Sequence, residues 1–202
     1  MEIPALPKRV DVDQKRLELV EAGWAVIAEE GLEGATLRRV AARAGCTTGA
    51  LTRYFPHRHD LVLEALRVAG DTAAKRMRAA ARAPGTRAEA LTRVLWEALP
   101  MDEVRHREWR VWLAFWSAAA ADDALSGENN RRYRQWTAVV TRLVRALPTP
   151  PADPAGEAAT LVALVDGLGL RVVLSGRGPT VLVAARAEAE RALLTQLSRL
   201  SQ

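Results

Sequence analysis

The feature that most constrains the fold is the spacing of apolar residues, which recur three and four positions apart along nearly the whole 202-residue chain. This period places them on one face of amphipathic α-helices. The alternation at every second residue that would indicate strands is nearly absent. Because proline and glycine interrupt the pattern at intervals, we predict an all-α fold of about nine helices. They are expected at about 11–30, 36–44, 48–54, 60–83, 86–99, 104–121, 127–147, 154–175 and 179–200.

Composition narrows the class of protein. Hydrophobic residues at 49% and charged residues at 26% are typical of a soluble globular chain. The 29 Lys+Arg against 24 Asp+Glu give a net charge of +5, which favours an anionic partner. A single cysteine, Cys46, rules out an internal disulfide and a thiol-based zinc site. With no signal peptide and no apolar run of ~18 residues, we expect a cytoplasmic protein without membrane attachment or cofactor.

The segment 36–59 carries five arginines and no carboxylate, although residues 1–70 hold ten of each sign. A segment free of acid is suited to approach phosphate. Within it, Gly45 permits the left-handed backbone that ends one short helix, and Thr47 can cap the next. Two short helices joined by a glycine turn match the helix-turn-helix of DNA-binding proteins, whose second helix lies in the major groove.

The second short helix offers donors and acceptors for base edges, while its glycine lets the backbone come close to DNA. Leu51 and Phe55 are expected to anchor its inner face. A single helix-surface arginine is usually only solvated, so Arg38 is a candidate DNA contact mainly as one of a group. His57 and His59 lack further ligands, and no metal site is expected. The expected groove-facing residues are Thr47, Thr48, Gly49, Thr52 and Arg53.

Three motifs then occur in unbroken order: Gly31-Leu-Glu-Gly-Ala-Thr36, Ala41-Ala-Arg-Ala-Gly45 and Tyr54-Phe-Pro-His-Arg-His-Asp-Leu61. With them, residues 11–70 resemble the tetracycline-repressor (TetR) family of bacterial transcriptional regulators. The resemblance implies a three-helix DNA-binding head at 11–58, with its helix-turn-helix at about 36–55. It further implies a connecting helix at 59–83 and a ligand-binding and dimerisation domain at 84–202.

The same resemblance implies roles for individual residues. Thr36 and Tyr54 would bond phosphates, and Arg58, where the family usually has lysine, would grip a phosphate. Two positions depart from the pattern. Thr52 stands where many members have tyrosine or serine, which shortens its reach, and Cys46 replaces the usual valine, so we expect it to be a small buried hydrophobe.

Five of the six tryptophans lie beyond residue 90, and three of them share one helical stripe. Such a stripe is more often core than pocket, but tryptophans that close-pack poorly often border a cavity. Aromatic faces suit a cationic or quaternary ammonium ligand, and an apolar or aromatic effector would also fit. Residues 101–116 and 164–171 resemble the betaine-pathway branch of choline-responsive, BetI-like repressors. The effector-binding candidates are Trp96, Trp109, Trp112, Trp116, Trp136 and Asp166, the last being alternatively a hydrogen bonder in helix packing.

The last two helices carry more apolar surface than a lone bundle needs, so we expect a four-helix interface across a two-fold axis. Such symmetry would place two reading helices about 34–36 Å apart, or a multiple of the helical turn, on a palindromic operator. The expected dimerisation residues are Leu161, Leu164, Leu168, Leu182, Leu193 and Leu197.

These features predict a homodimeric helix-turn-helix repressor that binds double-stranded DNA and is released by a small-molecule effector. The alternative is a constitutive DNA-binding or architectural protein without an inducer, which a closed tryptophan core would favour. An enzyme is disfavoured, because the sequence shows no nucleophile–base pair, metal cluster or phosphate loop.

Overall fold

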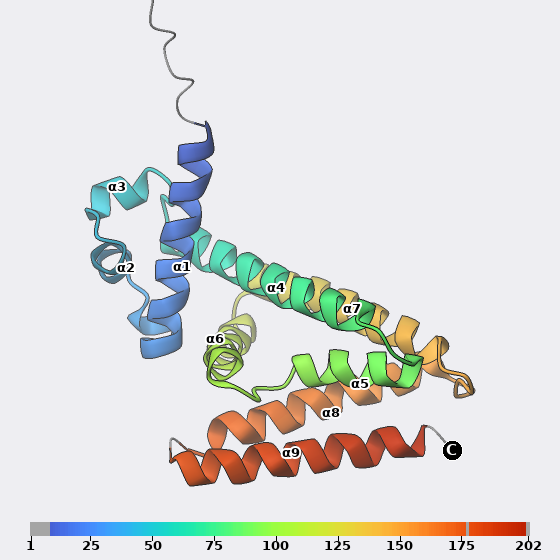
Figure 1. The fold of residues 1–202 in the computed structure, drawn as a ribbon. Helices are drawn as coiled ribbons and strands as arrows, with labels where there is room; N and C mark the ends of the chain where they lie inside the picture. Colours follow the sequence, from blue (N-terminus) through green and yellow to red (C-terminus); the bar gives the residue numbers. More distant parts are fainter. Residues whose placement is uncertain (1–8, 177, 201–202) are drawn as a thin grey trace, which may run out of the picture. The chain divides into compact units, whose positions relative to one another are not determined.

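The computed structural model describes residues 9–176 and 178–200, and every regular element in these ranges is an α-helix (Figure 1). The all-α prediction is therefore confirmed, and the described residues form nine helices. The chain divides into two compact units, one ending at Ala69 and the other beginning at Gly70. The helices are α1 (Arg9–Gly34), α2 (Leu37–Arg43), α3 (Thr48–Thr52), α4 (Arg58–Arg82), α5 (Arg87–Glu97), α6 (Glu103–Ala119), α7 (Asp123–Arg145), α8 (Pro154–Leu174) and α9 (Pro179–Arg199).

Local sequence signals set most helix ends. Gly45, at φ 65°, ends the turn after α2 as expected, whereas Gly31, at φ 75°, breaks α1 without ending it. α7 begins at Asp123, four residues before the expected Gly127, because the Asp122 carboxylate accepts the N–H groups of the first turn. The side chains that cap helices in this way are Thr36, Thr47, Thr86, Asp102, Asp122 and Asp153.

The N-terminal unit packs α1, α2, α3 and the start of α4 around one apolar core. Phe55 lies at its centre with no exposed surface, as expected, and the Arg16 guanidinium covers its ring at 4.4 Å. Leu17 of α1 is exposed. The buried face of α1 is formed by Leu19, Val20, Val26, Ile27 and Ala28.

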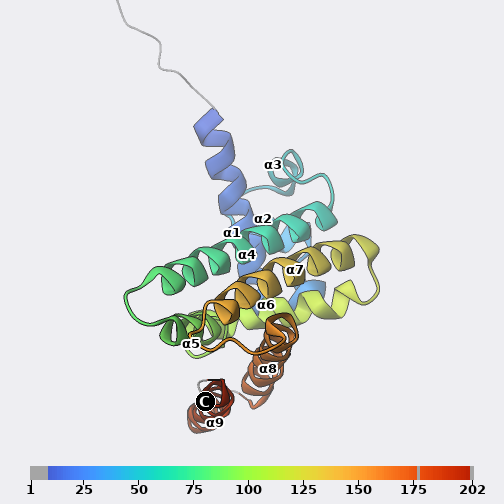
Figure 2. The ribbon, with the colours of Figure 1, turned by 90° about the vertical axis from the view of Figure 1, so that its right-hand side faces the viewer.

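The C-terminal unit is centred on α7 and α8, which pack along each other, and α9 lies beside α8 in both views (Figure 1, Figure 2). α5 closes this core, whose buried side chains are leucine, valine and alanine. α6 packs on α7 and α8, and Gly169 of α8 permits the closest approach. A Cβ at Gly169 would lie 2.1 Å from two ring carbons of Trp109, so a larger residue there would displace the ring.

A polar network joins three helices of the C-terminal unit. The Arg76 guanidinium of α4 donates to both carboxylate oxygens of Glu108 at 2.7 and 2.5 Å, and to Glu97 at 2.8 Å. Arg105 donates to the second oxygen of Glu97 at 3.2 Å. Glu108 is buried, so its charge depends on this pairing.

Across the described ranges, none of the helices combines the length and apolar character required to cross a membrane.

Candidate functional site

The first turn of α3 is an open, polar surface on a fixed backbone. The Thr47 hydroxyl accepts the Ala50 N–H at 3.1 Å and so fixes the start of the helix. Thr48 and Gly49 are exposed, and the Thr52 hydroxyl donates to the Gly49 carbonyl at 3.2 Å. A methyl group added at Gly49 would meet nothing within 4 Å. The packing of the chain itself therefore does not require glycine at this position.

The five arginines of segment 36–59 differ in whether a carboxylate pairs with them. Arg43 forms a bidentate pair with Glu29 at 2.8 and 2.9 Å, and Arg39 pairs with Glu30 at 2.6 Å. Both carboxylates come from α1, so a segment free of acid in sequence is partly neutralised by the neighbouring helix. Among the described residues, Arg38 and Arg53 are exposed and make no ion pair.

Arg58 is held by backbone carbonyls of the N-terminal unit. Its Nε donates to the Ala35 carbonyl at 3.0 Å and its Nη2 to the Leu32 carbonyl. These carbonyls lie at the end of α1, where the helix dipole favours a cation. The residue expected to grip phosphate thus ties the start of α4 to the end of α1.

The remaining candidates of the head lie close to this surface. Thr36 is exposed, and its hydroxyl accepts the Arg39 N–H at 3.3 Å. Tyr54 is half-buried, and its backbone carbonyl accepts from Arg16 at 3.2 Å. Cys46 is half-buried rather than buried, so the expectation of a core thiol was wrong.

A cluster of aromatic rings joins α6 to α7. Trp109 and Trp116 meet edge to face at 5.5 Å between ring centroids, and Trp116 lies 6.4 Å from Tyr133. The Trp109 indole donates to the Ala98 carbonyl at 2.8 Å. The Tyr133 hydroxyl donates to Asp166 of α8 at 2.7 Å. We call Trp109, Trp116, Tyr133 and Asp166 the aromatic cluster.

The structure thus joins three of the six effector candidates, Trp109, Trp116 and Asp166, through Tyr133. The Trp112 ring instead meets Phe115 at 6.5 Å between ring centroids. Trp96 and Trp136 pack instead against the apolar core of α5 and α7–α9, and no ring contact joins them to the cluster in the part of the chain that is described. Sequence reasoning missed Tyr133, because it lies 17 positions after Trp116 on another helix, outside any periodic stripe.

Burial controls the charge of Asp166. The loss of solvent raises its pKa to about 6, and the hydrogen bond from Tyr133 opposes this only in part. Burial, and then the Asp166 charge, raise the pKa of Tyr133. The Tyr133 hydroxyl therefore remains a donor at neutral pH, and Asp166 ionises at a cost in stability.

Replacing Asp166 with asparagine is expected to stabilise the protein at pH 7.5 by about 2 kcal/mol. A carboxyl whose folded pKa is raised loses stability as pH rises from its unfolded pKa, near 4, to about 6. Asparagine keeps an acceptor for Tyr133 and carries no charge, so its advantage should shrink towards zero at pH 4. Thermal unfolding at both pH values measures this, with Glu190→Gln, an exposed site on α9, as control. A less stable Asp166→Asn protein at pH 7.5 would contradict the assignment.

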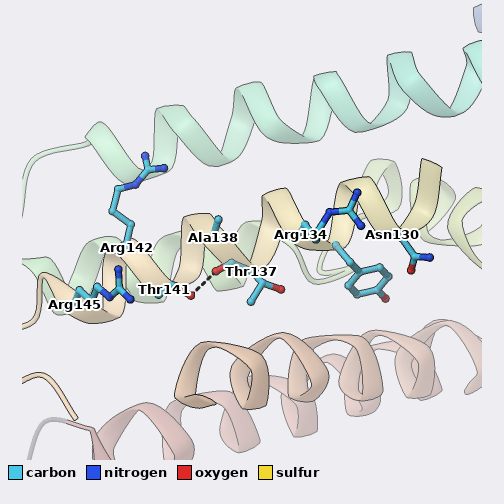
Figure 3. A pocket seen from close by; sticks show the side chains of 8 residues that line it. Asn130, Arg134, Thr137, Ala138, Thr141, Arg142 and Arg145 are labelled. Carbon is cyan, nitrogen blue, oxygen red and sulfur yellow. Dashed lines mark hydrogen bonds between the residues drawn. The ribbon is translucent and has the colours of Figure 1, made fainter. Parts of the chain in front are cut away.

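A hollow of about 700 Å³ lies beside α7 (Figure 3). Tyr133 is the member of the aromatic cluster that reaches it. The lining residues are Asn130, Tyr133, Arg134, Thr137, Ala138, Thr141, Arg142 and Arg145.

The expected dimerisation residues are mostly internal. Leu161, Leu168, Leu193 and Leu197 are buried in the core of a single chain, and Leu164 and Leu182 are half-buried. Periodicity could not separate the faces, because α8 is apolar on more than one side. The exposed apolar residues of α8 and α9 are Leu170, Leu174, Val181, Val183 and Leu194.

Among the described residues, no group of three or more histidine, cysteine or acidic side chains is placed to hold a metal ion.

Comparison with known proteins gives consistent matches over both units. Residues 19–65 match the family of bacterial regulatory proteins of the tetR type, and residues 87–200 match the C-terminal domain of BetI-type transcriptional repressors. The HTH-type transcriptional regulator PksA of Bacillus subtilis is 32% identical over 171 residues, 84% of this chain and 83% of its own. The regulator BetI of Burkholderia thailandensis is 33% identical over 180 residues, 86% and 89% of the two chains.

Solved structures of transcriptional regulators are also similar to this chain. A transcriptional regulator from Rhodococcus sp. Rha1 superposes with a TM-score of 0.81 at 31% identity, over 92% of this chain and 95% of its own. A protein from Saccharomonospora viridis, described as a transcriptional regulator in complex with choline, superposes with a TM-score of 0.79 at 26% identity, over 90% and 96%.

Proposed function

Because this chain belongs to the TetR family of helix-turn-helix transcriptional regulators and carries a BetI-type C-terminal domain, we propose that it is a dimeric repressor released from a palindromic operator by a small-molecule effector. The observation that carries this proposal is the first turn of α3, which is exposed, polar and open at Gly49. Such a repressor acts in the cytoplasm, where bacterial DNA lies.

On the operator, α3 enters the major groove. Thr47, Thr48, Thr52 and Arg53 face base edges or the adjoining backbone, and Gly49 allows the close approach. Thr36, Tyr54 and Arg38 bind phosphates and so fix the register without reading sequence. Arg58 contributes mainly by holding the start of α4, since two carbonyls already occupy its guanidinium.

A second copy binds through α8 and α9. Their residues Leu174 and Val183 retain 69% and 66% of their surface in one chain, and such exposed apolar side chains on two helices that contact each other are suited to an interface. A two-fold axis between the α8–α9 pairs would bury them and present two copies of α3 to successive major grooves.

A small-molecule effector acts on the C-terminal unit, and the solved regulator from S. viridis, which is described in complex with choline, supports a ligand of small size. Trp109 is nearly buried, which is what a closed core would show. Trp112 and Trp116 are only half-buried, and Tyr133 borders the hollow beside α7. These three residues favour a ligand-responsive protein over a constitutive one. An effector releases DNA only if it prefers a conformation that the operator does not.

Replacing Gly49 with alanine is expected to lower operator affinity at least tenfold without destabilising the protein. The added methyl group meets no protein atom within 4 Å and removes a glycine from a helix, which favours folding by about 0.5–1 kcal/mol. It would, however, stand between α3 and DNA. Fluorescence anisotropy on operator duplex and thermal unfolding measure the two effects.

Gly127→Ala is the matched control for this experiment. Gly127 is also an exposed helical glycine with nothing within 4 Å of an added Cβ, but it lies on α7 in the other unit. It should gain the same stability and leave DNA affinity unchanged. If both alanine variants bound the operator with equal affinity, α3 would not lie in the DNA interface.

A further inference from the structure

The hollow beside α7 is lined by three guanidinium groups and no carboxylate (Figure 3). The surrounding sequence has the same bias, because residues 129–152 contain five arginines and neither aspartate nor glutamate. An anion in the hollow would meet exposed guanidinium donors, whereas a cation would meet only like charge.

The arginines of the hollow differ from their neighbours on the same helix. Arg131 and Arg132 share the Glu128 carboxylate, at 2.5 and 2.9 Å. For Arg134, Arg142 and Arg145 there is no ion pair with any residue of 9–176 or 178–200.

The preference of a helix C-terminus for cations explains the position of only two of these three arginines. Arg142 and Arg145 lie in the last turn of α7, where the helix carbonyls favour cations. Arg134 lies about three turns from that end. The helix dipole therefore does not account for Arg134.

The protein already uses the groups that would suit a cationic ligand. The Arg132 guanidinium lies over the Trp112 ring at 5.5 Å from its centroid. The Arg132 guanidinium also packs closely against α4, because a Cβ added at Gly70 would lie 1.1 Å from its Nη1. The Asp166 carboxylate accepts the Tyr133 hydroxyl. A cation would have to displace an internal cation and an internal donor.

We infer that the effector of this protein is a small oxyanion, a phosphate or carboxylate compound, that binds in the hollow beside α7, where Arg134, Arg142 and Arg145 supply the positive charge. This rests on the proposed function, whose effector class it names. The volume of the hollow lies within the roughly 300–1,000 Å³ of small-molecule sites, which favours a compact ligand over a convex duplex. A ligand there contacts Tyr133, whose hydroxyl donates a hydrogen bond to Asp166 of α8.

Isothermal titration calorimetry on the full chain without DNA tests this inference. Inorganic pyrophosphate, citrate and choline are titrated separately at constant ionic strength. We expect saturable binding, one site per chain, for pyrophosphate or citrate, and the better of the two identifies phosphate or carboxylate as the preferred group. Choline should bind at least tenfold more weakly than that anion. The double variant Arg134→Gln/Arg142→Gln should weaken anion binding at least tenfold.

Two control variants locate the site. Arg107→Gln removes an exposed arginine of α6, and Arg191→Gln removes an exposed arginine of α9, so both should bind the anion as the parent does. The inference is overturned if neither anion binds saturably, if choline binds more tightly than both, or if the double variant retains parental affinity. Because no DNA is present, failure here is distinct from failure to bind an operator.

Discussion

Replacing Arg76 with methionine is expected to lower the free energy of unfolding by about 3 kcal/mol, because it leaves a buried carboxylate without its partner. The guanidinium binds both oxygens of Glu108 and one of Glu97. The Glu108 side chain is only 10% exposed, so water cannot replace these bonds. Methionine preserves the apolar stem of arginine, which separates the lost charge from lost packing.

Denaturant unfolding measures this change, and two variants control it. Arg78→Met alters an exposed arginine two positions further along α4 and should cost less than about 0.5 kcal/mol. The double replacement Arg76→Met/Glu108→Leu removes both charges and should recover a large part of the loss. If Arg76→Met and Arg78→Met are equally stable, the network does not hold the C-terminal unit together.

Introducing glutamate at both Leu174 and Val183 is expected to yield a monomer whose operator affinity is at least a hundredfold lower. These side chains are among the most exposed large apolar residues of the described chain, so the change costs the single chain little. In a two-fold dimer each glutamate would be buried or would face its symmetry mate, and both are unfavourable. A monomer contacts one half-site only, which removes the second set of phosphate and base contacts.

Sedimentation velocity and operator binding on the same samples measure the two effects. Val104→Glu is the control, because Val104 is 53% exposed but lies on α6, outside the proposed interface. It should remain dimeric and bind DNA normally. A Leu174→Glu/Val183→Glu protein that still sediments as a dimer would place the interface elsewhere.

The fold could be predicted largely from local rules. The three-and-four spacing gave the helices, and the main error in their bounds, at the start of α7, arose because Asp122 was taken as part of a break when it caps the helix. The apolar pattern also identified Phe55 and Leu51 as core residues. These properties depend on residues within one or two turns of each other.

The partners of long side chains could not be predicted in the same way. The sequence around Arg58 and Arg93 is typical of exposed arginines. Each of them nevertheless donates to two backbone carbonyls near the end of another helix. Arg39 and Arg43 find carboxylates on α1, which are separated from them in sequence by the end of that helix. A guanidinium reaches several ångströms, so its partner depends on tertiary packing rather than on sequence spacing.

Sequence spacing also could not show which face of a helix is buried, or which side chains on different helices pair. Leu161 and Leu193 have the spacing expected of an interface, but both lie wholly inside one chain. Tyr133 could be joined to Asp166 only once α7 and α8 were seen to pack along each other. Where a helix is apolar on several sides, periodicity shows that it is buried without showing which side meets a second copy.

In the proposed dimer, two copies of α3 read one palindromic duplex. The most direct test of this arrangement is a titration of the full-length protein against an operator selected from genomic fragments, and against the same duplex with one half-site scrambled. We expect two chains per operator duplex and affinity at least a hundredfold lower for the scrambled duplex, with binding weakening steeply as salt is raised. Equal affinity for the two duplexes, or saturation at one chain per operator, would contradict this arrangement.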